Sequence, residues 1–443
     1  MLSIWSDTIQ LPQFNQLQED INTDVLIIGG GMAGILCAHQ LKQAGVDYAL
    51  VEADRIGCGI TKNTTAKITS QHGLIYHKLY HKYGQEKARM YLDANETALE
   101  EYRNLCKGMD CDFQEQASFV YSIHDRAVLE KELETLEKLG FQAEAVGDLP
   151  LPFATVGAVC FPKQAQFHPL KFIARLAANL NIYENTFVKE LVKTDSNSAI
   201  KYQAVTAHGT ITAHKVIVAT HFPFLNTHGS YFLKMYQHRS YVLALEQTGN
   251  QVSKINGMYV DEAPKGMSFR TYKDLLFIGG GDHRTGKQGG NWKELEEFAG
   301  VHYPNAQEKY RWATQDCMTL DEIPYIGHYS AHTPNLYAAT GFNKWGMTSS
   351  MVAARILANF ILEKENPYAA VFSPSRSMLH PQLAINALEA TVNLLTPSTK
   401  RCPHMGCVLK WNPQEHSWDC PCHGSRFAED GGLIDNPAMR SLH

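Results

Sequence analysis

The pattern of hydrophobic and polar positions begins with a strand, a turn and a helix. Residues 24–28 (DVLII) form an unbroken apolar run, typical of a strand buried on both faces of a parallel sheet. Apolar residues then recur at helical spacing in 35–41, Gly45 ends the helix, and residues 48–52 (YALVE) form a second strand. This order predicts a strand–helix–strand unit.

Farther along, helical and strand-like patterns are mixed. We expect helices at residues 85–107, 125–139, 168–180 and 346–364, and strands at 117–122, 185–192, 210–220 and 274–281. This mixture favours the α/β (α+β) class, with a Rossmann-like nucleotide domain interleaved with an antiparallel-sheet substrate domain. We assign an N-terminal arm to 1–23, the nucleotide domain to 24–80, 150–225 and 315–373, the substrate domain to 81–149 and 226–314, a helical linker to 374–400, and a small all-β module to 401–443.

Composition excludes several classes of protein. The chain has 443 residues, 44% of them hydrophobic and 19% charged, and its net charge is -5. Such a chain can bury a large core, and it has no basic excess for nucleic acid. It shows no basic leader and no apolar run of about 18 residues. We therefore expect a cytoplasmic protein without a transmembrane segment or a nucleic-acid partner.

The first turn carries a dinucleotide-binding pattern. Gly29, Gly31 and Gly34 lie between the first strand and helix, and Glu52 ends the next strand. The glycines permit a tight turn, close approach of a pyrophosphate and close helix–strand packing, while Glu52 can accept a hydrogen bond from a ribose hydroxyl. A carboxylate at this position disfavours NADP.

No second nucleotide domain is apparent. Residues 277–286 (FIGGGDHRTG) contain adjacent glycines, but no strand ending in an acidic residue follows, so we interpret them as a hairpin turn. Cys58 lacks a near partner for a redox disulfide and is interpreted as structural. The electrons are therefore expected to come from an organic substrate.

Three further segments distinguish FAD from NAD: residues 53–73 after Glu52, 216–224 (VIVATHFPF) and 341–350 (GFNKWGMTSS). Over about residues 24–373 the chain resembles the D-amino-acid oxidase and glycine oxidase superfamily of FAD-dependent oxidoreductases. The resemblance implies FAD and a small amine or amino-acid substrate that is oxidised at a C–N bond. It implies further FAD contacts at Gly57, Gly59, Thr61, Val188, Thr220, Gly346, Met347 and Thr348.

The substrate side is less defined. The resemblance requires no protein base, because the flavin carries the chemistry. Arg270 could clamp a carboxylate with both nitrogens, and Tyr241 is a second candidate; His238, Arg239 and Tyr272 lie in the same domain. The alternative is that these are strand residues on a solvated face.

Cysteine is concentrated at the C-terminal end. Four of the ten cysteines fall in the last 42 residues, mixed with two histidines, which indicates a metal module. The skeleton Cys402-x-His404, fifteen residues, Cys420-x-x-His423 resembles the Rieske family. That resemblance implies a 2Fe-2S cluster held by these two thiolates and two imidazoles, with a higher potential than an all-cysteine cluster.

The Rieske resemblance also implies roles for neighbouring residues. Cys407 and Cys422 stand where cytochrome bc-type relatives have a disulfide, and Ser425 where a hydroxyl raises the potential. Phe427 replaces a tyrosine donor, so we expect a potential below that of the most oxidising members. The alternative is zinc in an S3N site of Cys402, Cys407, Cys420 and His423.

The module is unusually short. Rieske domains have several strands ahead of the first ligand loop, whereas residues 374–400 are mostly helical. We expect that helix to pack on the main domain through an apolar pattern formed by Leu379, Leu383, Leu388, Val392 and Leu395. The strands expected ahead of the first ligand loop, which form the rear of the cluster fold, are then absent, are supplied by another element, or were lost from this sequence near residues 396–400.

Together these features predict an oxidoreductase in which FAD accepts a hydride equivalent and the Rieske centre passes electrons singly to an acceptor. The alternatives are an oxidase that uses oxygen and carries a vestigial module, and a non-enzymatic iron or redox sensor. A tRNA-modifying flavoenzyme is disfavoured by the net charge.

Overall fold

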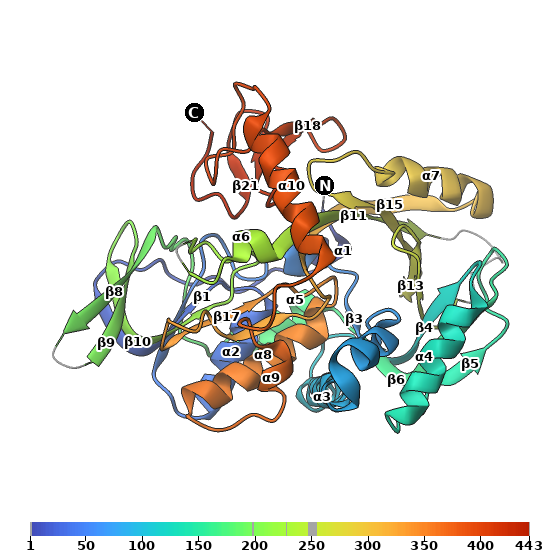
Figure 1. Cartoon of the computed structure of the whole chain (residues 1–443), viewed down its shortest axis with the longest axis horizontal. Coiled ribbons are helices and arrows are strands. Elements are labelled where there is room, and N and C mark those ends of the chain that lie inside the picture. The colour runs from blue at the N-terminus through green and yellow to red at the C-terminus, as the bar shows by residue number, and fades with distance from the viewer. Residues whose placement is uncertain (1, 197–198, 227, 247–254, 443) are drawn as a thin grey trace.

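The structure, a computed structural model, describes residues 2–196, 199–226, 228–246 and 255–442 (Figure 1). Its first large sheet has the order β16–β17–β10–β1–β2–β7, extended by β9 and β8 beside β10. The strands are β1 (Ile21–Ile28), β2 (Tyr48–Val51), β7 (Ile182–Tyr183), β8 (Glu190–Ser196), β9 (Ala199–Val205), β10 (Thr210–Val218), β16 (Tyr325–His328) and β17 (Leu336–Thr340). Because β7, β2, β1, β10 and β17 run parallel, their carboxyl ends meet at one edge.

Helices α2 (Met32–Gln43) and α8 (Gly346–Ile361) pack side by side against this sheet (Figure 1). The expected strand–turn–helix–strand unit is present as β1, α2 and β2. The other expected helices correspond to α3 (Ile75–Cys106), α4 (Arg126–Lys138), α5 (Pro169–Ala177) and α8. The shorter elements are α1 (Ile4–Asp7), η1 (Ile60–Asn63), α6 (Tyr231–Lys234), α7 (Asn291–His302) and α9 (Ala369–Phe372).

The second large sheet has the order β15–β11–β14–β13–β12–β4–β6–β3, with β5 beside β6. Its strands are β3 (Lys67–Ile68), β4 (Gln114–Ser122), β5 (Glu144–Val146), β6 (Gly157–Gln166), β11 (Met235–Glu246), β12 (Met258–Asp261), β13 (Ser268–Tyr272), β14 (Leu275–Arg284) and β15 (Gln307–Thr319). Strand β6 lies here rather than with the nucleotide segments to which 150–225 was assigned, because it pairs with β4 along most of its length.

The prediction of a hairpin turn at 277–286 was wrong. Strand β14 runs through these glycines as far as Arg284, and only the last residues form a turn. The pairing with β11 shifts between Arg239 and Tyr241, opposite Gly281, which has a φ of 66°. A β-bulge therefore accommodates the glycines inside the strand.

The C-terminal part consists of helix α10 (Pro381–Leu395) and a small sheet of β18 (Lys410–Asn412), β19 (Ser417–Asp419), β20 (Arg426–Ala428) and β21 (Leu433–Asp435). Figure 1 shows both standing on the catalytic domain, our name for the two large sheets with their helices. The expectation that α10 packs through its leucines was wrong, because Leu388 is 66% exposed and Leu395 78% exposed, whereas Asn386 and Asn393 are buried.

No helix in the described ranges is both long and apolar enough to cross a membrane.

Candidate functional site

A cavity of about 1350 Å³ lies between the two large sheets and reaches the C-terminal module. Ten of the predicted cofactor residues line it: Gly29, Gly31, Glu52, Gly57, Gly59, Thr61, Val188, Thr220, Gly346 and Met347. They come from the carboxyl edge of the first sheet and from the start of α8. The structure thus brings these residues to one place.

The other two predicted cofactor residues do not line the cavity. A Cβ on Gly34 would lie 1.9 Å from the carbonyl oxygen of Gly29, so this glycine lets α2 pack on the turn. Thr348 is buried and donates a hydrogen bond to the carbonyl of Thr69 (3.0 Å). Both residues support the walls of the site.

The glycine turn leaves room for a phosphate. Gly29 has a φ of 113°, and a Cβ there would lie 2.8 Å from the carbonyl oxygen of Ala219. The backbone of α2 begins directly behind it, where the positive end of a helix attracts an anion. At the end of β2, Glu52 accepts hydrogen bonds from the N–H groups of Gly30 (2.6 Å) and Asp54 (3.0 Å). Burial raises the pKa of Glu52, and this donor and acceptor set fits an adenine dinucleotide.

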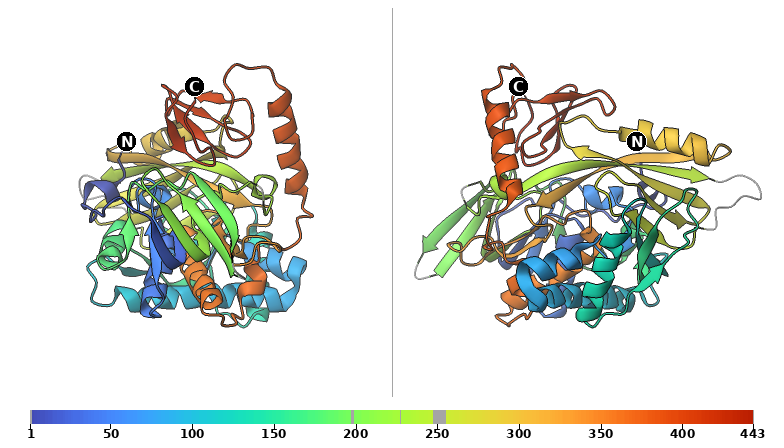
Figure 2. Two further views of the ribbon diagram at one scale, coloured as in Figure 1. Left: turned by 90° about the vertical axis from the view of Figure 1, so that its left-hand side faces the viewer. Right: turned by 45° about the vertical axis from the view of Figure 1, so that its right-hand side comes forward.

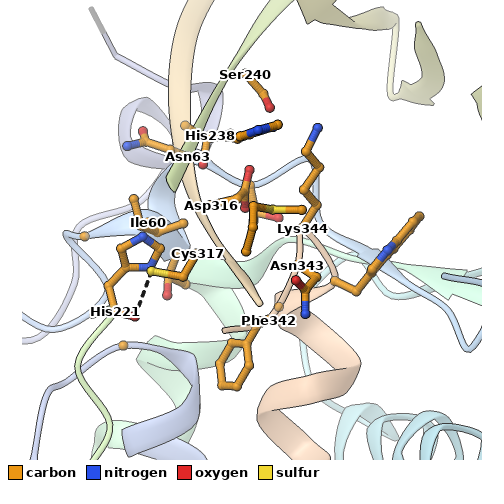
Figure 3. A pocket seen from close by; sticks show the side chains of 18 of the residues that line it. Ile60, Asn63, His221, His238, Ser240, Asp316, Cys317, Phe342, Asn343 and Lys344 are labelled. Carbon is orange, nitrogen blue, oxygen red and sulfur yellow. Dashed lines mark hydrogen bonds between the residues drawn. The ribbon is translucent and has the colours of Figure 1, made fainter. Parts of the chain in front are cut away.

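Strands β11 and β15 pair over their whole length, and we call this pair the β11–β15 ribbon. Alternate side chains of a strand point to opposite faces. On the face toward the first sheet, His238 lies opposite Asp316 and Ser240 opposite Thr314, and all four line the cavity (Figure 3). One strand pair therefore forms the wall of the cavity facing the predicted cofactor residues.

The charges on this wall are unusual. Burial raises the pKa of Asp316 to about 6, although Lys344 opposes the shift. Burial lowers the pKa of His238 to about 4, so this ring is neutral at pH 7. Lys344 forms an ion pair with Asp282. Asp316 is thus a carboxylate in a confined space whose nearest cation already has a partner. No sequence motif marks Asp316, which sequence reasoning missed, and Lys344 lies in the segment 341–350 without having been given a role.

The two predicted catalytic residues have different surroundings, because Tyr241 lines the cavity and Arg270 does not. Arg270 is fully buried outside the cavity lining, and its guanidinium donates to the carbonyl groups of Thr65 and Ala66. The hydroxyl of Tyr241 donates to Glu415 of the module at 2.9 Å. Arg270 thus lies outside the lining with its Nε and Nη2 atoms buried without a hydrogen-bond partner, and its role as a clamp stays a prediction, while Tyr241 also contacts the module.

The predicted metal ligands come together in the module. The ring centroids of His404 and His423 are 4.9 Å apart, and the Nδ1 atom of each ring is buried without a hydrogen-bond partner. The thiols of Cys402 and Cys420 are buried and within hydrogen-bonding range of each other. Two thiols beside two open imidazole nitrogens are the donor set of a Rieske cluster.

The remaining two cysteines are close to this group. The sulfur atoms of Cys407, Cys420 and Cys422 lie within 4.8 Å of one another, and all are free thiols in this structure. The disulfide between Cys407 and Cys422 therefore stays a prediction, with its partners near each other. Helix α10 covers this side, because Asn393 accepts a hydrogen bond from the N–H of Val408 (3.0 Å). The sequence allows three possibilities for the strands missing ahead of the first ligand loop. The structure agrees with the one in which another element, here helix α10, covers this side of the module.

The module is held on the opposite face of the β11–β15 ribbon by buried charges. Glu415 accepts hydrogen bonds from Arg239 (Nε, 3.0 Å) and from Arg426 (2.8 Å). These side chains are only 10%, 4% and 6% exposed. Burial disfavours the charge on Glu415, but the two arginines outweigh it and hold the pKa of Glu415 below its ordinary value.

A short segment after β10 connects the cavity with the metal ligands. Thr220 and His221 line the cavity. The ring of the next residue, Phe222, is fully buried, with its centroid 6.5 Å from that of His404 and 6.2 Å from that of His423. Two consecutive residues therefore reach from the cofactor cavity to both imidazoles.

Hydrogen bonds parallel this connection. His221 Nε2 lies 2.9 Å from Gln237 Oε1, and Gln237 Nε2 donates to the carbonyl of His423 (2.6 Å). Gln315 Nε2 donates to the carbonyl of Gly424 (2.8 Å). A Cβ on Gly424 would lie 2.7 Å from Gln237, so the ligand loop packs directly on the ribbon.

Comparisons with known proteins agree with this geometry. Residues 24–360 match the FAD dependent oxidoreductase family model, and residues 392–443 match the Rieske [2Fe-2S] domain model. The chain is 34% identical over 492 aligned positions to the Rieske 2Fe-2S iron-sulfur protein YhfW of Bacillus subtilis (strain 168), covering 99% of this chain and 96% of that protein. It is 25% identical to the gamma-glutamylputrescine oxidoreductase of Escherichia coli (strain K12), over 79% of this chain and 85% of that one.

Among solved structures, glycine oxidase from Geobacillus kaustophilus superimposes with a TM-score of 0.66 at 18% identity, covering 81% of this chain and 99% of that chain. This likeness shows the fold of the catalytic domain. The chain belongs to the FAD-dependent oxidoreductase family and carries a Rieske [2Fe-2S] domain at its C-terminal end.

Proposed function

We propose that this protein dehydrogenates the C–N bond of a small amine or amino-acid-like substrate on FAD and passes the electrons through its Rieske cluster to an external one-electron acceptor. The observation that carries the proposal is Phe222, whose ring contacts both imidazole ligands while His221 before it lines the cavity.

Bound FAD supplies a site that accepts a hydride equivalent and releases single electrons. The residues of the chain hold and orient it. The glycine turn and the start of α2 would hold the pyrophosphate, and Glu52 would accept hydrogen bonds from the ribose hydroxyls. Helix α8 begins at Gly346 in the cavity wall, where the positive end of the helix favours negative charge on a reduced ring.

At the substrate end, the carboxylate of Asp316 is placed to hold an ammonium group. The cavity-lining arginines among the described residues, Arg239 and Arg426, are both bound to carboxylates of the module. Neither is free to take a substrate carboxylate. The cavity is also lined by Lys62, Lys67, Lys78 and Lys344. We base the substrate class on Asp316 and the paired arginines, which favour a substrate recognised by its amine; this amine loses two electrons and two protons to become an imine.

A 2Fe-2S cluster held by the module would accept one electron at a time, so the two electrons from one substrate molecule would leave in two steps. Phe222 and the backbone after Thr220 provide a short covalent and packed route between the two sites. Gln237 and Gln315 fix the ligand loop on the ribbon, which keeps the separation constant.

The test is anaerobic mixing of iron- and sulfide-replete holoprotein with glycine, L-proline and γ-glutamylputrescine. We expect at least one amine to bleach the flavin absorption and to produce the electron paramagnetic resonance signal of a reduced Rieske cluster. Flavin that is bleached while the cluster stays oxidised would indicate an oxygen-using oxidase instead. Failure of every amine, with dithionite reducing both centres, would contradict the substrate class.

A further inference from the structure

The imidazole side of the cluster site is turned toward the catalytic domain. His404 Nε2 is hydrogen-bonded to Asn226 Oδ1 (3.0 Å), and His423 Nε2 to the carbonyl of Phe232 (2.9 Å). On the proposed function, on which this inference rests, electrons enter here. An external acceptor must therefore approach another side, which is formed by the first ligand loop and α10.

That side carries an exposed apolar surface, which we call the exit patch. It consists of Leu388, Val392, Leu394, Leu395 and Met405, which are between 38% and 78% exposed. The helix and the loop are continuous at this point, because a Cβ on Gly406 would touch Leu394 at 3.8 Å. Arg401 joins them by donating to the carbonyl groups of Leu394 and Gly406.

Helix α10 is attached by its polar face and presents its apolar face to solvent. Asn386 Oδ1 accepts a hydrogen bond from Arg284 (3.0 Å), Ala390 packs against the core of the module, and the carbonyl of Glu389 lies 4.0 Å from the sulfur of Cys422. In the views of Figure 2, none of the other described helices and strands lies outside this helix. An apolar face exposed in this way marks an interaction site, and its helix touches the cysteine cluster.

The rim of the exit patch is basic. Between residues 390 and 414 the chain has Lys400, Arg401 and Lys410 but no aspartate or glutamate, although the whole chain has a net charge of -5. All three are exposed. Glu389, just before this stretch, is paired with Lys287. The patch therefore combines an apolar centre with the positive charges of Arg401, which is hydrogen-bonded to Leu394 and Gly406, and of its chain neighbour Lys400.

We propose that the exit patch is the docking site of a small, acidic, one-electron carrier protein. An acidic carrier is steered toward the positive rim, and the apolar centre then brings it into short-lived contact. Redox partners bind through interfaces below about 1200 Å², which a patch of this size can supply. One electron passes from the reduced cluster to the oxidised carrier, and no bond is made or broken.

The experiment uses the full holoprotein with its cluster reduced anaerobically by a stoichiometric amount of dithionite. Its reoxidation is followed by stopped flow with an acidic c-type cytochrome and, separately, a basic c-type cytochrome of similar potential. The variants are Leu395→Asp and Lys400→Glu, and the matched controls on exposed α7 are Val301→Asp and Lys293→Glu. Because dithionite replaces the substrate, the assay does not depend on transfer from flavin to cluster.

We expect both patch variants to lower the second-order rate with the acidic cytochrome at least tenfold at low salt and to flatten its ionic-strength dependence. The controls, the iron content and the cluster spectrum should stay unchanged. Wild-type rates in both patch variants would overturn the proposal. So would equal rates with the acidic and the basic cytochrome.

Two other occupants have distinct signatures. If the patch joins two copies of this chain, Leu395→Asp will halve the mass in solution without changing the reoxidation rate. If it binds a membrane, the wild-type protein will sediment with anionic phosphatidylglycerol vesicles and Lys400→Glu will not. Either result without a change of rate overturns the carrier proposal.

Discussion

The cofactor cavity and the module interface are built from different parts of the chain. The cavity depends on backbone geometry, above all on Gly29 and Gly34, where any side chain would collide with a carbonyl group. The interface depends on long side chains, with Arg239 and Arg426 meeting Glu415 on the opposite face of the same ribbon. The first site is therefore sensitive to volume, and the second to charge.

The strongest way to break the cavity is Gly34→Ala. The added Cβ would lie 1.9 Å from the carbonyl oxygen of Gly29, so α2 has to move away from the turn. We expect the purified protein to contain less than about a tenth of the wild-type FAD, measured by absorption after denaturation, because the phosphate site is lost. Gly300→Ala on α7, where nothing lies within 4 Å of the Cβ, should bind FAD normally.

The interface between the module and the ribbon should be strongly destabilised by removal of the Glu415 carboxylate. Glu415→Ala leaves Arg239 and Arg426 buried without this partner, a change that costs about 3–5 kcal/mol. Denaturant unfolding monitored at the module should show this loss. Glu297→Ala, in an exposed pair with Lys293, should cost less than about 1 kcal/mol.

The same interface should also weaken in acid. Because the pKa of Glu415 is lower in the folded protein than in the unfolded chain, its contribution is complete above the ordinary glutamate pKa of about 4.3 and is lost as the pH falls through the folded value. Stability that declines between pH 8 and pH 6 in wild type but not in Glu415→Ala would contradict this account.

The substitution Asp316→Asn distinguishes the role of the cavity face of the ribbon from that of the module face. We expect flavin reduction by an amine to slow about 10–100-fold, since the ammonium loses a charge-assisted hydrogen bond worth about 1.5–3 kcal/mol. In wild type the rate should rise with pH through about 6 as Asp316 ionises. The variant should lack this limb, while dithionite-reduced cluster and module stability stay unchanged. A variant that keeps the limb would assign it to another group.

The smallest effect is expected inside the module. Phe427 is fully buried two residues after Ser425, and a tyrosine there restores the hydroxyl that the Rieske resemblance leads us to expect. Phe427→Tyr should raise the cluster potential by about 60 mV, the value of a tenfold change in equilibrium for one electron. Redox titration followed by electron paramagnetic resonance measures it, and Ser425→Ala should shift the potential the opposite way.

The sequence was sufficient to predict the features that short local motifs specify, namely the nucleotide-binding turn and the two metal-ligand loops. Gly29, Glu52 and the strand–turn–helix between them form one local unit, and the four metal ligands lie in two short loops. The docking of the module could not be predicted, because Arg239 and Glu415 are 176 residues apart and no local pattern links them. Asp316 was missed for the same reason, since its partner on β11 comes from a strand more than 70 positions earlier.

The apolar pattern of helix α10 led to a wrong prediction of its buried face, and the structure gives the physical reason. Its leucines have the spacing of a buried helix face, yet the buried residues are Asn386 and Asn393. The side chain of Asn386 accepts a hydrogen bond from Arg284 of the catalytic domain, and the backbone carbonyl of Asn393 accepts one from Val408 of the module. Apolar spacing shows that a helix has an apolar face, but it does not show whether that face is buried.

The central claim is that electrons pass from the cavity to the module through Phe222. The most direct test is anaerobic rapid mixing with a reducing amine, freeze-quenching and electron paramagnetic resonance of the Rieske signal. We expect the cluster of the wild type to become reduced as its flavin is reoxidised, and Phe222→Ala to slow this step at least tenfold at unchanged cluster potential, whereas Phe298→Ala on α7, outside the cavity lining, keeps the wild-type rate. Equal rates in wild type and Phe222→Ala, or a cluster that stays oxidised, would contradict the account.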